Sequence, residues 1–254
     1  MEYQFLKQIR EQNPLIHNII NNVVINFVAN GLLALGASPI MGEEFLEMRD
    51  FSRFCNALAI NIGSITELSL KAMLQAGFSY NKEQKPIVFD PVGVGVSEFR
   101  IKAVKELLEK VHFSAIRGNV AEISFLATGQ WGGKGVDAGN SSENAEKIAE
   151  LVKNVAKKYN CVVIASGAVD FVSNGEEVLS FNYGSPMFPR ITGSGCLFSA
   201  VVGAFLAVAK PSDYFLAAQE ATIFYAKCGE NAAKNLKNHE FGSFMINFLN
   251  SLGV

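Results

Sequence analysis

The stretch Pro86–Asn119, "PIVFDPVGVGVSEFRIKAVKELLEKVHFSAIRGN", contains the repeating unit that decides the fold. Two short apolar runs, Pro86–Gly93 and Phe113–Asn119, have the character of buried strands, and each ends in polar or glycine residues. The segment between them, Glu98–Val111, carries helical periodicity. A strand, a helix and a second strand in this order are typical of a parallel pair joined by a crossover helix.

The same alternation continues on both sides of this unit. Strands are also predicted at Ala57–Gly63 and Cys161–Gly167, because each is a short apolar run that ends in a polar or glycine turn. Segments with helical spacing lie at Ile65–Ala76, Val120–Ala127 and Ser142–Lys158. The pattern predicts an α/β fold in a single domain over residues 1–254, with a mostly parallel central sheet and helices on both faces.

The rest of the chain follows a different pattern. Two extended runs in Val169–Gly184 flank Asn174 and Gly175, a dipeptide that favours a hairpin turn. The polar connection Gly129–Asn144 is rich in glycine, and it is either a surface loop or a loop near a ligand. The C-terminal part is predicted to be helical, at Cys196–Ala209, Asp213–Leu236 and Phe241–Leu252.

Composition and charge narrow the class of partner. The 254 residues are 49% apolar, enough for a full core, and the net charge of −2 comes from intermixed acidic and basic residues. This balance argues against nucleic acid or an anionic membrane as a partner, so a small molecule is expected. We expect a cytoplasmic protein, because the sequence has neither a signal-peptide pattern nor an apolar run that could span a bilayer.

Cysteine and histidine spacing argues against a metal site built from these residues. The cysteines lack C-x-x-C spacing and are predicted to be free thiols: Cys55, Cys161, Cys196 and Cys228. The histidines are isolated from any second ligand, and structural roles are predicted for them: His17, His112 and His239.

Polar residues at strand ends are the candidates for chemistry, because ligands bind beyond the carboxyl ends of the strands in open α/β sheets. Asp90 precedes the glycine-rich "VGVGV" and is either a cap or a ligand. Arg117 and Asn119 end another strand, and Glu122 lies one helical turn further on. Asn119 and Glu122 can therefore face the same space, or form a capping box. Ser166 could contact a phosphate, or only close its turn.

A glycine-rich loop precedes the predicted helix at Cys196. In "RITGSGCLFSA", Gly193, Ser194 and Gly195 have little side-chain bulk, and the helix start leaves N–H groups free to bind an anion. Cys196 would face that anion. The helix start would lower the pKa of its thiol, and a bound triphosphate would raise it again.

Together, the loop, an arginine and two carboxylates favour nucleotide-dependent phosphoryl transfer with a hydrated Mg²⁺. Neither the G-x-x-x-x-G-K-[ST] motif nor the protein-kinase set with H-R-D occurs in the chain. Two common phosphoryl-transfer signatures are thereby excluded, but the reaction is not.

With these residues in place, the sequence resembles the hydroxyethylthiazole kinase family of the ribokinase-like superfamily. The resemblance is dense in Pro14–Met41, "PLIHNIINNVVINFVANGLLALGASPIM", and continues through "NIGS", "DPVGVG", "RGNVAEI", "KGVDAG" and "TGSGC", so that it covers roughly the whole chain. It implies a ribokinase-like fold. It also implies phosphorylation, by ATP and magnesium, of the hydroxyethyl group of 4-methyl-5-(2-hydroxyethyl)thiazole in thiamine biosynthesis or salvage. A homotrimer with active sites at the subunit interfaces is implied as well.

The resemblance assigns roles to residues on the alcohol side of the site. Met41 matches a methionine that contacts the thiazole, and Asn21 falls in the "NN" of the same pocket. Gly193 matches a substrate-side glycine of the anion loop. Pro189, just before this loop, departs from the family pattern, so the sequence does not determine the backbone conformation at the entry to the loop. Read from the sequence alone, Met41 is a core residue.

The remaining assignments concern the nucleotide and the proton. Arg117 matches an arginine that contacts ATP, and Ser166 stands where the family commonly has a threonine, with the hydroxyl kept. Asp90 and Glu122 match acidic residues associated with the phosphates and Mg²⁺. Cys196 occupies the place of an aspartate base in many sugar kinases of the superfamily. Cys196 is thus either a catalytic residue that accepts or relays the hydroxyl proton, or a packing residue at a helix start.

Three other functions compete with the thiazole kinase. A pyrimidine kinase can also carry cysteine after the glycine loop, but "NNVVINFVANGLLALGASPIM" argues against it. A nucleotide-dependent dehydratase of hydrated nicotinamide nucleotides shares the resemblance in the sheet and loop, but usually has aspartate where this chain has Cys196. A binding module without catalysis is disfavoured, because the carboxylates, arginine and loop are all present.

Overall fold

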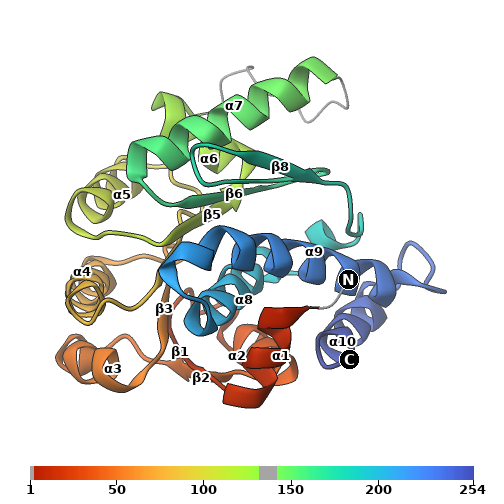
Figure 1. Ribbon diagram of the computed structural model, residues 1–254, viewed down its shortest axis with the longest axis horizontal. Coiled ribbons are helices and arrows are strands. Elements are labelled where there is room, and N and C mark those ends of the chain that lie inside the picture. Colours follow the sequence, from red (N-terminus) through yellow and green to blue (C-terminus); the bar gives the residue numbers. More distant parts are fainter. Residues whose placement is uncertain (1–2, 132–141) are drawn as a thin grey trace.

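A computed structural model describes residues 3–131 and 142–254, and in these ranges eight strands form one sheet in the order β2-β1-β3-β4-β5-β6-β7-β8 (Figure 1). The six strands from β2 to β6 in this order are parallel, and β7 and β8 add an antiparallel hairpin at one edge. The strand bounds are β1 Leu15–Ile19, β2 Ser38–Met41, β3 Ala57–Asn61, β4 Ile87–Asp90, β5 Ala115–Asn119, β6 Val162–Ser166, β7 Asp170–Ser173 and β8 Val178–Phe181.

Helices cover both faces of the sheet, as the sequence predicts. Figure 1 shows α3, α4 and α5 on one side of strands β1 and β3, and α1, α8 and α9 on the other. The α-helices span α1 Gln4–Gln12, α2 Ile25–Leu35, α3 Met48–Phe54, α4 Glu67–Lys82, α5 Glu98–Lys110, α6 Val120–Thr128, α7 Ser142–Tyr159, α8 Ser194–Val208, α9 Tyr214–Ala233 and α10 Phe241–Leu252. Short 3₁₀ turns are η1 Phe45–Glu47, η2 Phe188–Arg190 and η3 Pro211–Asp213.

Two hydrophobic cores lie between the sheet and these helices. Successive side chains of a strand point to opposite faces, so Leu58 and Ile60 of β3 enter one core while Ala57 and Ala59 enter the other. The first core is closed by α1, α2, α8, α9 and α10, and the second by α3 to α7. Both faces of the central strands are therefore buried, which explains their almost continuous apolar sequence.

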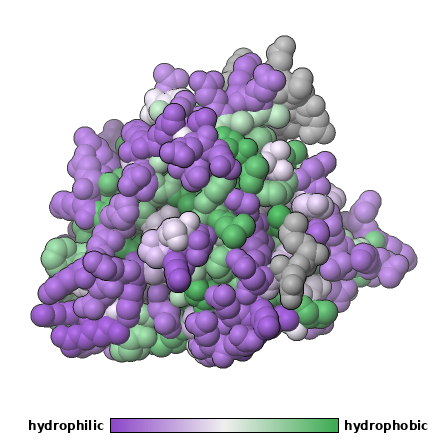
Figure 2. Space-filling model, viewed as in Figure 1, coloured by the Kyte–Doolittle hydropathy of each residue, from purple (hydrophilic) through white to green (hydrophobic). Residues whose placement is uncertain are grey.

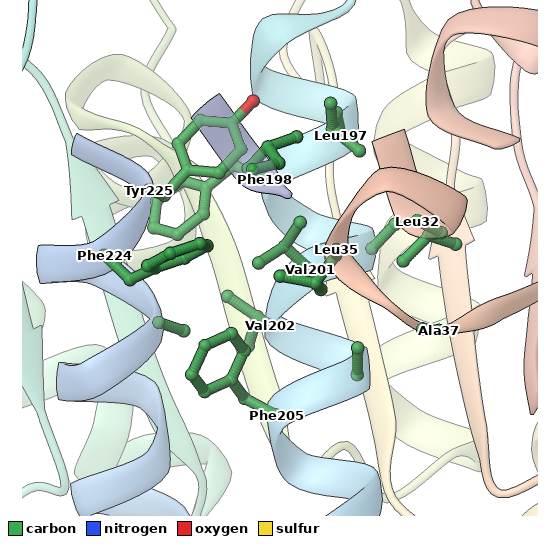
Figure 3. Packing of buried hydrophobic residues seen from close by; sticks show 14 of the residues in the cluster. Leu32, Leu35, Ala37, Leu197, Phe198, Val201, Val202, Phe205, Phe224 and Tyr225 are labelled. Atoms are coloured by element: carbon green, nitrogen blue, oxygen red, sulfur yellow. The ribbon is translucent and has the colours of Figure 1, made fainter. Parts of the chain in front are cut away.

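Helix α8 lies at the centre of the first core, between α9 and α2 (Figure 3). Its residues from Leu197 to Leu206 are buried without interruption, as expected for a helix that is apolar all round. A Cβ at Gly31 of α2 would lie 2.4 Å from Leu197, so the glycine lets the two helices approach closely. This close contact with α2 positions the N-terminal end of α8.

The predicted hairpin is present. Ser173 of β7 pairs with Val178 of β8, and the Asn174 side chain accepts hydrogen bonds from the N–H groups of Glu176 and Glu177 at 2.9 and 2.8 Å. Gly175 adopts a positive φ of 92°, which glycine tolerates without strain.

The structure confirms the prediction for the cysteines, all four of which are free thiols. Most of the connection Gly129–Asn144 lies outside the described residues, so its two interpretations stay open. Within the described ranges, no helix is long and apolar enough to cross a membrane. Hydrophilic side chains predominate on the face in Figure 2, with hydrophobic ones gathered near its centre.

Candidate active site

Four neighbouring strands end at the same edge of the sheet and bring the polar candidates together. Asn61 at the end of β3 is in register with Asp90 at the end of β4. Asn119 at the end of β5 is in register with Ser166 at the end of β6. The N-terminal part of α8 reaches the same edge, because Ser199 of α8 donates a hydrogen bond of 2.8 Å to Asp90.

Asp90 is the most deeply buried carboxylate of this group, at 1% exposed. Its Oδ2 atom accepts hydrogen bonds from Asn61 Nδ2 at 2.7 Å and from Ser199 Oγ at 2.8 Å. Its Oδ1 atom is buried and has no hydrogen-bond partner among the residues that the structure describes. Burial raises the pKa of the Asp90 carboxyl, and the nearby Arg117 guanidinium opposes this shift. Asp90 thus keeps one oxygen available to a ligand.

Glu122 and Asn119 form the capping box at the start of α6. The Asn119 side chain accepts from the Glu122 N–H at 2.9 Å, and Glu122 Oε2 accepts from the Asn119 N–H at 2.8 Å. Glu122 Oε1 also accepts from the N–H of Gly93 at 2.9 Å, in the loop after β4. The capping interpretation is correct, and the same carboxylate also links two loops of the site.

Arg117 lies between the strand ends and the glycine-rich loop. Its guanidinium donates to the Ser166 hydroxyl and lies 5.1 Å from the ring centre of Phe198. A Cβ at Gly195 would be only 2.7 Å from Arg117 Nη1, so glycine at this position lets the guanidinium lie against the loop. The Nε atom is buried without a hydrogen-bond partner in the described parts of the chain. A fixed positive charge therefore lies beside the loop.

The loop itself has the geometry that its glycines favour. Gly193 is the N-cap of α8 with a φ of 92°, and its carbonyl accepts from the Leu197 N–H at 2.8 Å. A Cβ at Gly193 would also lie 2.8 Å from Val24. Ser194 is the first residue of α8, and its hydroxyl donates to the Phe188 carbonyl at 3.1 Å. Pro189 lies in the 3₁₀ turn η2, which is therefore the backbone conformation at the entry to the loop that the sequence did not determine.

Cys196 is joined to Asp90 through two asparagine side chains. Asn21 Nδ2 contacts both the Cys196 sulfur at 3.4 Å and Asn61 Oδ1 at 3.0 Å, and Asn61 in turn donates to Asp90. Burial, together with the negative charge of Asp90, raises the pKa of the Cys196 thiol to about 11. The expected lowering by the helix start is therefore outweighed by burial, and the thiol is protonated at neutral pH.

Met41 lies farther from this cluster. It ends the edge strand β2, two strands away from β3, is half-buried, and packs against the first core. Its neighbour in the register is Asn18 of β1, whose Oδ1 atom is buried without a partner among the described residues. The structure is thus consistent with the core interpretation of Met41.

Sequence reasoning did not select three residues that shape this site. Asn61 ends a strand just as Asp90 does, so the strand-end rule could have found it. Ser199 lies one turn beyond Gly195 in a helix. Arg100 of α5 donates to the carbonyls of Ile62, Gly63 and Val92 at 2.5, 2.6 and 2.8 Å, and so ties together the loops after β3 and β4. Nothing in the sequence distinguishes this arginine from a surface residue.

Comparison with known proteins gives a full-length match. The model of the "HK: Hydroxyethylthiazole kinase family" matches residues 6–254. A relative from Actinobacillus succinogenes, "Hydroxyethylthiazole kinase", is 49% identical over 254 residues, which cover 100% of this chain and 94% of the relative. A solved structure of a hydroxyethylthiazole kinase protein from Pyrococcus horikoshii OT3 has a TM-score of 0.88 at 35% identity, covering 99% of this chain and 92% of that one.

More distant structures share the fold. A ribokinase-like superfamily protein from Enterococcus faecalis V583 has a TM-score of 0.64 at 12% identity, covering 99% of this chain and 94% of that one. The predicted fold class is confirmed, an α/β fold with a mostly parallel sheet of the ribokinase-like type.

Proposed function

This chain belongs to the hydroxyethylthiazole kinase family, and on this premise we propose that it transfers the γ-phosphoryl group of ATP to the hydroxyl of 4-methyl-5-(2-hydroxyethyl)thiazole. The reaction would serve thiamine biosynthesis or salvage in the cytoplasm. The observation that carries the proposal is the match of the family model to residues 6–254. The anion loop, Arg117 and the two carboxylates at one sheet edge supply the chemistry that the reaction needs.

Magnesium fits the carboxylates of this edge. Asp90 Oδ1 is a buried oxygen without a hydrogen-bond partner in the described part of the chain, and the charges of Asp90 and Glu122 are close enough to interact. The described residues hold no group of three or more His, Cys, Asp or Glu side chains that could bind a metal. Asp90 and Glu122 would therefore hold Mg²⁺ together with water and phosphate oxygens, the arrangement that this ion prefers. Bound Mg²⁺ neutralises negative charge on the phosphates.

The anion loop and Arg117 would bind the nucleotide phosphates. The first N–H groups of α8 have no acceptor within the helix, and the positive end of the helix dipole adds to their attraction for an anion. Arg117 contributes a full positive charge beside Gly195, and Ser166 holds its guanidinium in place. Positioning and charge stabilisation of this kind account for most of the rate in phosphoryl transfer.

Cys196 orients the substrate hydroxyl in this proposal. The substrate oxygen forms a bond to the γ-phosphorus while ADP leaves, and the hydroxyl proton is lost late because the transition state is loose. A thiol with a pKa of about 11 can accept a hydrogen bond from the hydroxyl without being ionised beforehand. As it takes up the hydroxyl proton, it would pass its own S–H proton to an oxygen of the transferring phosphoryl group. Asn21 holds the sulfur from the side of the proposed thiazole pocket, which Asn21 and Met41 would share.

The proposal includes a homotrimer whose active sites are completed at subunit interfaces. Apolar side chains that follow Asn21 and Met41 closely in the sequence are exposed, with Val23 at 76%, Phe45 at 46% and Leu46 at 78%. Exposed apolar residues suit a subunit interface. Light scattering of the purified protein tests this part, and a stable, fully active monomer would contradict it.

The decisive experiment is a substrate panel. The purified protein is incubated with ATP, Mg²⁺ and a thiazole, a pyrimidine or a sugar alcohol, and the phosphorylated products are measured. We expect the thiazole alcohol to be phosphorylated fastest, with no turnover when Mg²⁺ is removed by a chelator. Turnover of the pyrimidine alcohol without turnover of the thiazole alcohol would contradict the proposal and indicate a pyrimidine kinase.

A further inference from the structure

Tyr225 reaches the anion loop from helix α9, on the side of α8 opposite to α2. It lies in α9, is buried, and its hydroxyl donates a hydrogen bond to the carbonyl of Ser194, the first residue of α8. Figure 3 shows the hydroxyl of Tyr225 directed toward the end of α8 at which Leu197 and Phe198 lie. Burial raises the pKa of the Tyr225 hydroxyl well above its usual value, so the group keeps its proton and acts as a donor.

The ring of Tyr225 has little freedom to move. It stacks on Phe198 with ring centres 4.7 Å apart and an angle of 18°, and on Phe188 at 5.5 Å and 12°. The face-to-face packing of Tyr225 and Phe198 is visible in Figure 3. A Cβ at Gly229 of α9 would lie 2.3 Å from Phe188, so a glycine one turn after Tyr225 makes room for this stack.

The stack also extends to the charged group of the site. The Arg117 guanidinium lies 5.1 Å from the centre of the Phe198 ring, and Phe188 accepts the hydrogen bond from the Ser194 hydroxyl at 3.1 Å. Ser194 is therefore held at its side chain by η2 and at its carbonyl by α9. Tyr225 contacts, through its hydroxyl and its ring, both the loop and the residue that supports Arg117.

The direction of one carbonyl fixes the direction of the next N–H group. In a planar trans peptide the C=O and N–H bonds point in opposite directions. The Tyr225 hydroxyl bonds to the Ser194 carbonyl, and the Gly195 N–H of the same peptide points in the opposite direction from that carbonyl. This N–H is one of the first in α8, which lack an acceptor within the helix, and Arg117 lies against the same residue.

From these contacts we infer that Tyr225 is a positioning residue for phosphoryl transfer: its hydroxyl holds the Ser194–Gly195 peptide so that the Gly195 N–H is directed at the transferring phosphate. The inference rests on the proposed kinase function. A donor that is already aligned with developing charge lowers the barrier, because no reorganisation is needed during the reaction.

The test removes only the hydroxyl. Tyr225→Phe keeps the aromatic stack, and Tyr80→Phe is the matched control, since Tyr80 is fully buried in the other core. We expect Tyr225→Phe to lower kcat roughly tenfold, less than the 10²- to 10³-fold loss that follows outright removal of such a donor. KM for the thiazole alcohol should change by less than about twofold, since in this proposal the peptide acts on the transferring phosphate and not on the alcohol. Tyr80→Phe should keep the parental kcat.

A second measurement does not depend on turnover. In ¹H–¹⁵N spectra, the Gly195 amide resonance should shift in Tyr225→Phe and stay in place in Tyr80→Phe. A parental kcat in Tyr225→Phe would overturn the inference even if the resonance shifted, and so would an unshifted Gly195 resonance. If the parent does not phosphorylate the thiazole, the proposed function fails, and the Gly195 resonance alone then decides whether Tyr225 orients the peptide.

Discussion

The side-chain amide of Asn61 donates a hydrogen bond of 2.7 Å to the buried carboxylate of Asp90, and it accepts one of 3.0 Å from Asn21. Asn61 is the last residue of β3, whereas Asn21 lies in the loop after β1 and also contacts the sulfur of Cys196. Asn61 therefore fixes the distance between the carboxylate proposed for Mg²⁺ and the thiol proposed for the hydroxyl.

Replacing Asn61 tests this relationship. Asn61→Ala removes both hydrogen bonds, so that Asp90 keeps only the bond from Ser199 and Asn21 keeps only its contact with the Cys196 sulfur. At about 1 kcal/mol for each bond, kcat/KM should fall by roughly ten- to thirtyfold, as measured by product formation. Asn154→Ala, at an exposed position of α7, should match the parent. Parental activity in Asn61→Ala would mean that Asp90 and Cys196 are positioned without it.

Glu122→Gln separates the charge of this residue from its shape. The variant keeps most of the capping geometry but removes the negative charge, so activity should fall and a higher Mg²⁺ concentration should be needed for half-maximal rate. A Mg²⁺ titration of the initial rate measures this. Asn119→Ala is the complementary variant, because it breaks the capping box but leaves the Glu122 carboxylate in place. It should lower the melting temperature without raising the Mg²⁺ requirement. Full activity and unchanged Mg²⁺ dependence in Glu122→Gln would mean that Glu122 only caps helix α6 and does not bind Mg²⁺.

The parallel sheet could be predicted from sequence because its strands are buried on both faces. Runs such as that of β6, Val162–Ser166, stand out by apolar content alone. The helix α4 extends beyond its predicted end at Ala76 because Gly77 does not break it: a Cβ there would lie 2.4 Å from Val111, so the glycine serves close packing. The edge strand β2 has no such signal, since all four of its residues are half-buried and one is proline.

In the candidate site, too, some residues could be predicted from local sequence and others could not. Asp90, Arg117 and Ser166 follow from a general rule about strand ends, which uses only local sequence. Ser199 and Tyr225 act through partners that are 109 and 31 positions away in the chain. Their roles depend on how α8 and α9 pack against each other and the sheet, and that packing is decided by the whole core.

Acid should destabilise the fold through His17. This residue is fully buried, its Nε2 atom lies 2.9 Å from the Gly42 carbonyl, and burial lowers its pKa from 6.5 to about 4. The unfolded chain therefore binds the proton more tightly, so the contribution to stability is complete above pH 6.5 and is lost as the pH falls toward 4. The full loss is on the order of 3 kcal/mol.

Urea unfolding at several pH values measures this effect. The fall in unfolding free energy between pH 7 and pH 4.5 should be smaller in His17→Gln than in the parent, whereas His239→Gln, at an exposed position, should follow the parent. An identical pH dependence in the parent and His17→Gln would rule out His17 as the source.

Cys196 gives the sharpest test of the reaction itself. Its thiol is held by Asn21 and is protonated at neutral pH, since burial raises its pKa to about 11. We expect Cys196→Ala to lower kcat more than it raises KM for the alcohol, because the hydroxyl loses the group that orients it. Cys196→Asp should keep substantial activity and can exceed the parent, since a carboxylate is a stronger hydrogen-bond acceptor than a neutral thiol and can also accept the proton. Cys161→Ala, a buried cysteine at the opposite end of β6, is the control for loss of a thiol and should keep the parental kcat. Turnover of Cys196→Ala at the parental rate would make Cys196 a packing residue and leave catalysis to the anion loop, Arg117 and Mg²⁺.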